Sequence, residues 1–230
     1  MSDSTDRSAE GGKVVVFGNG QMAEIAHWYL TSDSPFDVVG FCVDTDYITD
    51  DKYKGQPVVP FESVADHYPP DDHLLFIPIS AKEVNRLRAT KYEAAKGMGY
   101  RFASYVSTRA MVAPGVPIGD NCFILENNVV QPFASIGNDC ILWSGNHIGH
   151  HSTVMDHCFL ASHVVISGRV RVHPYCYFGV NSTVRDGIEI GEGCVVGAGA
   201  LIMRSAKKGS VYAQAHTRRA PFAAESARIV

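Results

Sequence analysis

Six of the chain's ten histidines lie close together in the sequence, between positions 147 and 173. An imidazole with an unperturbed pKa of about 6.5 can take up a proton near neutral pH, which suits general-base catalysis. The adjacent pair His150 and His151 is the strongest candidate for this role, and His147 could share it. The full set is His147, His150, His151, His157, His163 and His173.

A glycine-rich turn near the amino end could bind a phosphate group. Residues 18–23 read G-N-G-Q-M-A, a G-x-G-x-x-A pattern between an apolar strand-like segment, 13–17, and a helix-like segment, 21–30. Such a turn lets backbone amides and the N-terminus of a helix approach a phosphate. Asp44, after a second strand-like segment, is placed to hydrogen-bond a ribose hydroxyl. A tight turn without a ligand remains the alternative.

The segments around this turn predict a small α/β domain over residues 13–105. Strand-like and helix-like segments alternate there, with a second strand expected over 38–43, a third over 74–79 and a further helix over 81–97. This alternation is typical of a parallel sheet covered by helices. The domain has about half the size of a dinucleotide-binding fold, so a mononucleotide suits it better.

Residues 106–205 repeat with a period of six. An apolar residue stands at every sixth position from Val112 to Ile202 without interruption. A hexapeptide period indicates a short extended segment and a turn, with the apolar residue pointing into a continuous core. Three hexads per coil predict a triangular parallel β-helix of about five coils, packed directly against the α/β domain. The repeat alone does not give its handedness.

Five of the six cysteines recur every 18 residues, which is the length of one coil. Each stands four residues after a repeat aliphatic, a place that small residues such as Ala134 and Ser152 also occupy. We interpret this ladder as core packing, because buried cysteine behaves as a small hydrophobe. Disulfides and a cysteine nucleophile are the weaker alternatives. The ladder consists of Cys122, Cys140, Cys158, Cys176 and Cys194.

The same repeat constrains a metal interpretation of the histidines. His151, His157 and His163 are six residues apart, so that they occupy equivalent places on successive sides of the prism and face away from one another. Within one chain they cannot converge on a zinc ion. Two subunits could combine them, as in the γ-class carbonic anhydrases, but we expect no metal.

Composition and charge exclude several classes of protein. With 230 residues and 46% hydrophobic content, the chain is long enough to bury a hydrophobic core. Its net charge of -4 does not indicate the basic surface that is typical of nucleic-acid-binding proteins. No apolar run is suited to a signal peptide or a membrane span, which predicts a cytoplasmic protein with reduced thiols. We expect residues 1–12 to be disordered and 206–230 to form a tail. The end is basic, with Arg204, Lys207, Lys208, Arg218, Arg219 and Arg228 against one acid, Glu225.

Three further segments complete a larger pattern, namely I-G-H-H at 148–151, G-V-N-S-T-V at 179–184 and V-G-A-G-A-L at 196–201. With the G-x-G turn, Asp44 and the hexads, they make the chain resemble the hexapeptide acyltransferases of the sialic acid O-acetyltransferase type. That group includes N-acetyltransferases of nucleotide-linked amino sugars such as bacillosamine and perosamine precursors. The resemblance covers Lys13 to about Arg219 and implies a left-handed β-helix. It also implies a homotrimer with active sites between neighbouring prisms.

The resemblance further implies roles for individual residues. His150 matches the catalytic base of the family. The nucleotide-sugar site would consist of Gly20, Gln21, Met22, Asp44 and Thr45, together with Ser80 and Lys82 from a later loop. Contacts with acetyl-CoA would come from Gly168, Val180 and Ala198.

The chain departs from the family pattern at three places. The residue after the base is usually Asp or Glu, which raises the basicity of the histidine, but here it is His151. The second histidine that often lies nine residues beyond the base is replaced by Phe159, and a histidine follows only at His163. The usual terminal G-x-P-A-K is replaced by the residues 213–218, A-Q-A-H-T-R.

Taken together, these features predict an acetyl-CoA-dependent N-acetyltransferase that acts on the amino group of a nucleotide-linked deoxyamino sugar. The resemblance implies direct transfer in a ternary complex, with His150 as the base, backbone amides stabilising the oxyanion and the basic end near the 3'-phosphate of the coenzyme. Three alternatives stay open. They are a sugar O-acetyltransferase, a zinc-dependent hydratase and a non-catalytic sugar-nucleotide-binding scaffold.

Overall fold

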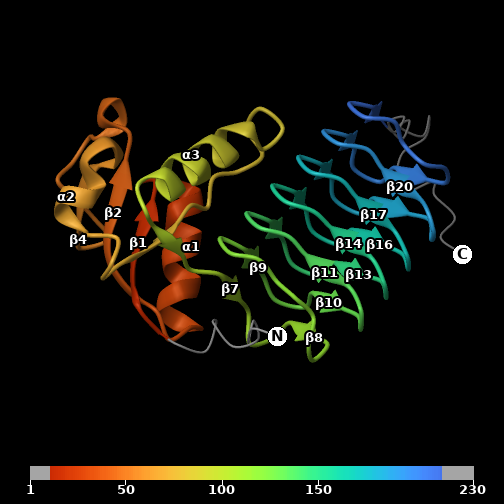
Figure 1. Ribbon diagram of the computed structural model, residues 1–230, viewed down its shortest axis with the longest axis horizontal. Coiled ribbons are helices and arrows are strands. Elements are labelled where there is room, and N and C mark those ends of the chain that lie inside the picture. Colours follow the sequence, from red (N-terminus) through yellow and green to blue (C-terminus); the bar gives the residue numbers. More distant parts are fainter. Residues whose placement is uncertain (1–10, 214–230) are drawn as a thin grey trace, which may run out of the picture.

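The computed structural model describes residues 11–213, which form an α/β domain followed by a parallel β-helix (Figure 1). Residues 1–10 and 214–230 lie outside the described part. They include most of the segment predicted to be disordered, and Arg218, Arg219 and Arg228 of the basic end. Within residues 11–213, none of the helices combines the length and hydropathy needed to span a bilayer.

The α/β domain contains one mainly parallel sheet, as the alternation of segments predicts. Its strand order is β3-β4-β2-β1-β5-β6, and only the β3–β4 pair is antiparallel. The chain runs outward from β1 through β2 to β4, and then returns to the other side of β1 with β5. Ligands of such sheets bind where the strand order reverses, at the carboxyl ends of the central strands. The strands are β1 (Lys13–Phe17), β2 (Asp37–Val43), β3 (Lys52–Tyr53), β4 (Gln56–Pro60), β5 (Leu74–Phe76) and β6 (Arg101–Phe102).

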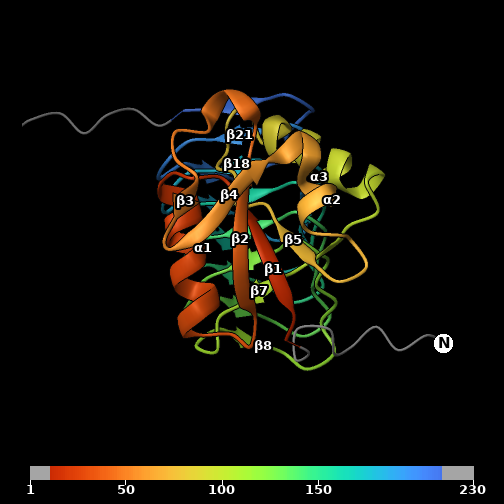
Figure 2. The ribbon, with the colours of Figure 1, turned by 90° about the vertical axis from the view of Figure 1, so that its left-hand side faces the viewer.

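Helices cover both faces of this sheet (Figure 2). The helix α1 (Gln21–Ser32) packs on the face that is turned toward the β-helix, and α3 (Arg86–Gly97) packs on the opposite face. The shorter elements are α2 (Val64–His67) and the 3-10 turns η1 (Thr45–Tyr47) and η2 (Phe61–Ser63).

The predicted helix over 81–97 begins later than its sequence suggests. Glu83, Val84 and Asn85 all have positive φ, between 51° and 66°, and therefore cannot belong to a right-handed helix. The Asn85 side chain donates to the Cys176 backbone oxygen, at 3.0 Å, in the β-helix. A contact with residues distant in sequence thus holds this turn in a conformation that local propensity does not favour. The third predicted strand likewise ends at Phe76 rather than at 79.

The β-helix has three flat faces built from two-residue strands. Face 1 contains β7 (Tyr105–Val106), β9 (Phe123–Ile124), β12 (Ile141–Leu142), β15 (Phe159–Leu160), β18 (Tyr177–Phe178), β21 (Val195–Val196) and β23 (Val211–Tyr212). Face 2 contains β8 (Met111–Val112), β10 (Val129–Val130), β13 (His147–Ile148), β16 (Val165–Ile166), β19 (Thr183–Val184) and β22 (Leu201–Ile202). Face 3 contains β11 (Ser135–Ile136), β14 (Thr153–Val154), β17 (Arg171–Val172) and β20 (Glu189–Ile190). Strand pairing continues past residue 205 to β23, into the segment expected to be a tail.

The second residue of each two-residue strand points into the prism, where the hexad period places its aliphatic. From Ile124 to Ile202 these residues are buried in one continuous cluster, and the ladder cysteines are buried among them. Each ladder thiol donates to a backbone carbonyl at 3.1 to 3.4 Å. Burial raises the pKa of Cys122, Cys158 and Cys194, so these groups remain thiols. The interpretation of the ladder as core is confirmed.

Turns join the faces along three edges of the prism. At every sixth position from Gly115 to Gly199 the turn contains a residue in the left-handed region. Edge I, between faces 3 and 1, carries Asn121, Asp139, His157 and Tyr175 at this place. Edge II, between faces 1 and 2, carries Asn127, Gly145, His163 and Asn181. Edge III, between faces 2 and 3, carries Phe133, His151, Arg169 and Gly187.

The α/β domain lies across face 1 and contacts edges I and II, which border this face. Outward residues of face 1, such as Phe123 and Phe159, share an apolar cluster with β1 and α1. On edge II, the Tyr29 hydroxyl of α1 donates to Glu126 Oε2 at 2.6 Å. On edge I, Arg88 of α3 forms an ion pair with Asp139. Edge III is the edge opposite face 1, so the α/β domain of the same chain does not cover it.

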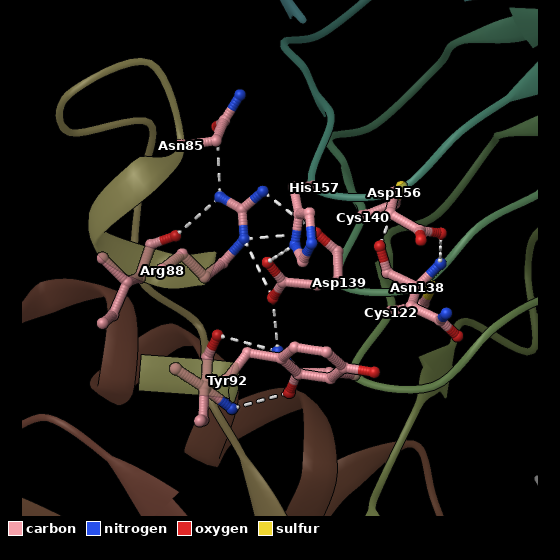
Figure 3. Close-up of polar contacts among 12 residues, drawn as sticks. Asn85, Arg88, Tyr92, Cys122, Asn138, Asp139, Cys140, Asp156 and His157 are labelled. Atoms are coloured by element: carbon pink, nitrogen blue, oxygen red, sulfur yellow. Dashed lines mark hydrogen bonds and ion pairs between the residues drawn. The ribbon is translucent and has the colours of Figure 1, made fainter. Parts of the chain in front are cut away.

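A buried polar cluster joins α3 to edge I (Figure 3). The Arg88 side chain is fully buried, and its Nε lies 3.1 Å from Asp139 Oδ1. The same guanidinium donates to the backbone oxygens of Asp139, Ile79 and Cys158. Asp139 also accepts from Asn121 Nδ2 at 2.7 Å and lies 2.8 Å from His157 Nδ1. Because every charged group here has a partner, burial of the cluster is tolerated.

Candidate functional site

The adjacent histidines His150 and His151 occupy the turn of edge III and are both exposed. Their Nδ1 atoms lie 3.1 Å apart, and the two rings are nearly perpendicular. The backbone N–H of His150 donates to Gln131 Oε1 at 2.9 Å, which ties this turn to the preceding coil. The ring of His151 lies against Phe133, with 4.7 Å between ring centroids. The hexad repeat places both residues at turn positions, and both side chains face outward from the prism.

The Nε2 side of the His150 ring lies over Gly168 in the next coil. A Cβ atom on Gly168 would come within 2.7 Å of His150 Nε2, closer than real side chains approach. Gly168 was predicted to contact the coenzyme. In the structure, the absence of a side chain at Gly168 leaves room for the ring of His150, the candidate base.

The other histidines of the cluster are separated by the coil. His147 is on β13 and points outward from face 2, beside edge III. His163 is on edge II, next to Gly145, and His173 lies within 3.5 Å of Glu189 on face 3. His157 is on edge I and is buried between Tyr92 and Tyr175. As the spacing of six predicts, His151, His157 and His163 therefore lie on three different edges.

The predicted nucleotide-sugar residues gather at the carboxyl edge of the parallel sheet. Gly18 has a φ of 108°, and its N–H donates to the Cys42 backbone oxygen, which joins the ends of β1 and β2. Gly20 begins α1 without a side-chain cap, and a Cβ there would meet nothing within 4 Å. Gln21 and Met22 form the first turn of α1. This is an open helix N-terminus suited to a phosphate group.

The remaining predicted residues of this group line the same edge. Asp44 forms an ion pair with Lys91 of α3, and Thr45 Oγ1 donates to Glu62 Oε2 at 2.9 Å. Hydrogen bonds from its own backbone N–H and from Thr45, which outweigh the opposing effect of desolvation, hold the pKa of the Glu62 carboxyl below its usual value. Ser80 and Lys82 lie in the loop between β5 and α3, just before the left-handed turn at 83–85.

Val180 and Ala198 are stacked on edge II, one coil apart. The N–H of Gly199 donates to the Val180 backbone oxygen at 2.8 Å, and Val180 is exposed. Gly168, the third residue predicted to contact the coenzyme, is on edge III instead. Within one chain, the three therefore do not form a single surface.

The structure thus separates the predicted site residues into three groups. The candidate bases are on edge III, two coenzyme candidates are on edge II, and the nucleotide-sugar candidates are in the α/β domain on face 1. Edge III is the edge of the prism opposite face 1, so within one chain the candidate bases and the predicted nucleotide-sugar residues lie on different sides of the prism.

Sequence reasoning missed several residues that shape these groups. Gln131 and Phe133 support the histidine pair from the preceding coil. The repeat could have indicated Phe133, because it stands one coil of 18 residues before His151. Tyr47 is 66% exposed, and its backbone oxygen accepts from Asn19 Nδ2 of the glycine-rich turn. No local pattern indicates Tyr47, since its position depends on how the ends of β1 and β2 meet.

Two family models match the repeat region of the chain. The bacterial transferase hexapeptide (six repeats) matches residues 133–168. The hexapeptide repeat of succinyl-transferase matches residues 108–130 and 175–204. A search of curated protein sequences found no match.

Solved structures similar to this chain cover most of its length. The acetyltransferase domain of PglB from Neisseria gonorrhoeae FA1090 matches with a TM-score of 0.77 and 20% identity, over 86% of this chain and 95% of that one. Perosamine N-acetyltransferase from Caulobacter crescentus, in a mutant form with CoA and GDP-perosamine, matches with a TM-score of 0.77 and 23% identity, over 87% and 92%. WeeI from Acinetobacter baumannii AYE has a TM-score of 0.67 and 17% identity, over 88% and 96%.

These likenesses show the fold. It is the predicted one, a small α/β domain followed by a left-handed β-helix of hexapeptide repeats. The matches include both parts of the chain, because they cover more than four-fifths of its residues.

Proposed function

We propose that this chain is an acetyl-CoA-dependent N-acetyltransferase that acts on the amino group of a nucleotide-linked deoxyamino sugar. The observation that carries this proposal is the exposed histidine pair on the free edge of a hexapeptide β-helix, with His150 Nε2 directed over Gly168. The structural likeness to a PglB acetyltransferase domain and to perosamine N-acetyltransferase supports it.

In the proposed reaction, the sugar amine attacks the thioester carbonyl of acetyl-CoA, and the carbon–sulfur bond breaks as the amide forms. His150 Nε2 removes the proton that the amine loses, and this proton is available to the departing thiolate. Both substrates bind together, so the acetyl group passes directly between them. Backbone N–H groups beside edge III would stabilise the oxyanion.

The nucleotide sugar would bind at the carboxyl edge of the parallel sheet. The open turn at Gly20 and the first turn of α1 would hold the diphosphate. Asp44 would bind a ribose hydroxyl while its ion pair with Lys91 fixes its position. The exposed ring of Tyr47 would pack against the base, and Ser80 and Lys82 would close the site from the other side of β1.

We further propose that the active site forms between subunits of a homotrimer. Face 2 offers a surface for this contact, because its outward row is largely apolar and its ends, Met111 and Leu201, are 65% and 62% exposed. The outward row of face 3 contains Ser135, Thr153, Arg171 and Glu189 instead. Packing on face 2 would place edge III of one prism beside a neighbour, and the coenzyme would lie between them. The six free thiols are compatible with the cytoplasmic location that we continue to expect.

The test is a coenzyme A release assay over a panel of uridine-, thymidine- and guanosine-linked amino sugars. Turnover of one of these substrates is expected. The mass of the product shows how many acetyl groups were transferred, and its stability to base distinguishes N-acetylation from O-acetylation. His150→Ala should lower kcat about 10²- to 10⁴-fold, because it removes the general base.

The matched control for this variant is His173→Ala, since His173 lies beside Glu189 on face 3, where none of the predicted site residues lies. It should retain the wild-type rate. Near-normal turnover by His150→Ala would contradict the assignment of the base. Thermal stabilisation by nucleotide sugars without any by acetyl-CoA would favour a binding scaffold instead.

A further inference from the structure

The candidate base has a histidine partner where the related enzymes usually have a carboxylate. His150 Nδ1 lies 3.1 Å from His151 Nδ1, and both rings are exposed on edge III. Among residues 11–213, no carboxylate forms an ion pair with either ring. Which ring nitrogen of neutral His150 carries the proton therefore depends on which of the two histidines donates the hydrogen bond between them.

A hydrogen bond between two Nδ1 atoms requires one N–H and one lone pair. If His150 donates, neutral His150 carries its proton on Nδ1 and its lone pair on Nε2. If His151 donates, neutral His150 carries its proton on Nε2 and cannot accept another there. Only the first arrangement gives a base on the side of the ring that faces Gly168.

Neighbouring groups fix both partners of this bond. His151 has a φ of 60°, and its ring lies against Phe133, which reduces its choice of orientations. The backbone N–H of His150 donates to Gln131, and its backbone oxygen accepts from Arg169 N–H at 2.8 Å. The distance between the two Nδ1 atoms is thus set by the turn and by the coils on both sides of it.

We propose that His151 is a positioning residue, whose Nδ1 accepts the hydrogen bond from His150 Nδ1–H and so keeps His150 Nε2 free to take up a proton. This inference rests on the proposed function, in which His150 is the base. When His150 gains its proton, the same bond remains, and neutral His151 helps to stabilise the imidazolium. A hydrogen-bond acceptor, and not a negative charge, is then what the position after the base requires.

Substitutions at position 151 can separate accepting from donating, because the repeat shows which residues this place tolerates. Asn121, Asn127 and Asn181 adopt positive φ at equivalent turn places, as does Arg169 directly above His151. Asn offers an acceptor oxygen, whereas Arg offers donors only. His151→Asn and His151→Arg therefore fit the same backbone but present opposite hydrogen-bonding groups to His150.

We expect His151→Asn to keep kcat within about threefold of the wild type, and His151→Arg to lower kcat about 10²-fold or more without a matching rise in KM. Circular dichroism melting checks that both variants are folded. Equal kcat for His151→Arg and the wild type would overturn the proposal. So would a loss of kcat in His151→Asn as large as that in His151→Arg.

A spectroscopic measurement tests the same inference without using activity. In the full-length protein with ¹⁵N-labelled histidine, the His150 signals, assigned by their loss in His150→Ala, should show a protonated Nδ1 and an unprotonated Nε2. His151→Arg should reverse this pattern. A wild-type His150 protonated at Nε2 would overturn the inference even if the protein is active. The expected pattern in a protein without acyltransferase activity would support it and reject the proposed function.

Discussion

At the scale of single residues, the position of the His150 ring on edge III depends on Gly168, which has no side chain. Gly168 is not in the left-handed region, so its backbone does not require glycine. Its importance lies in the His150 ring, which occupies the space where a Cβ would be. Gly168 therefore sets the position of the candidate base through the absence of a side chain.

Replacing Gly168 with alanine should reduce activity without unfolding the protein. The new Cβ would lie 2.7 Å from His150 Nε2, and an exposed ring can rotate away at little cost to stability. We expect kcat to fall at least about tenfold, because displacement of a base by about 1 Å is costly for catalysis. Steady-state kinetics and thermal melting measure the two effects.

The matched control is Gly97→Ala at the end of α3, where a Cβ would meet nothing within 4 Å. It should change neither kcat nor the melting temperature appreciably. A Gly168→Ala variant with wild-type kcat would show that the His150 ring does not occupy this space during catalysis.

At the scale of elements, two polar contacts add to the apolar packing of the α/β domain on face 1, and we call them joints. The first connects α3 to edge I through Arg88 and Asp139. The second connects the end of α1 to the first coil, where Asp33 accepts from the Tyr105 hydroxyl and the Thr108 N–H. Both consist of polar groups with several partners each. They fix the carboxyl edge of the sheet relative to the prism, and with it the predicted nucleotide-sugar site.

Replacing Arg88 with methionine should destabilise the protein strongly. The change leaves the Asp139 carboxylate buried without its guanidinium, and breaking a buried pair in this way costs about 3–5 kcal/mol. Urea denaturation measures the loss. The double variant with Asp139→Asn should recover part of it, because the uncompensated charge is then absent.

The control for the first joint is Arg101→Met, at an exposed arginine on β6. A surface change of this kind should alter the free energy of unfolding by less than about 0.5 kcal/mol. If Arg88→Met had an equally small effect, the buried cluster would not hold the domains together.

The second joint should make stability depend on acid pH. Desolvation opposes ionisation of Asp33, but hydrogen bonds from Thr108, Tyr105 and Ser107 outweigh it and lower its pKa from 3.8 to about 2. Because the folded pKa is the lower one, the stabilisation is complete above pH 3.8 and is lost as the pH falls toward 2.

The stability advantage of the wild type over Asp33→Asn should therefore shrink between about pH 4 and pH 2. Urea denaturation at several pH values, followed by tryptophan fluorescence, checks this. Tyr105→Phe removes one donor and should give a smaller change of the same sign. If the difference in free energy of unfolding between the wild type and Asp33→Asn were the same at all pH values, ionised Asp33 would not stabilise this contact.

At the scale of the whole molecule, the candidate base on edge III and the predicted nucleotide-sugar residues of one chain lie on different sides of the prism. This separation predicts complementation between two inactive variants. His150→Ala chains keep a normal α/β domain, and Asp44→Ala chains keep a normal edge III. In a mixed assembly, some sites combine the intact part of each.

Co-expression of the two variants in equal amounts should restore about one quarter of wild-type activity, since each site draws its two halves at random from neighbouring subunits. Each variant alone should be nearly inactive, and the mass of the assembly in solution should correspond to a trimer. Absence of recovery in verified mixed assemblies would mean that one chain supplies the complete site.

The sequence by itself determined the repeat, the identity of the inward residues and the outward direction of the histidine pair. These follow from a period of six, because each hexad decides locally which residue points inward and which occupies the turn. The sequence also predicted β1, the turn at Gly20 and α1, since a short apolar strand, glycines and an amphipathic helix are local signals.

Only the tertiary structure decided which edge of the prism the α/β domain leaves free. His151 and His157 occupy equivalent places in the repeat, yet His151 is exposed and His157 is buried beside Asp139 and Tyr92. The same long-range contacts hold Asn85 in its left-handed turn and delay the start of α3. A repeat makes its three edges alike in sequence, so only packing against a domain distant along the chain makes them different.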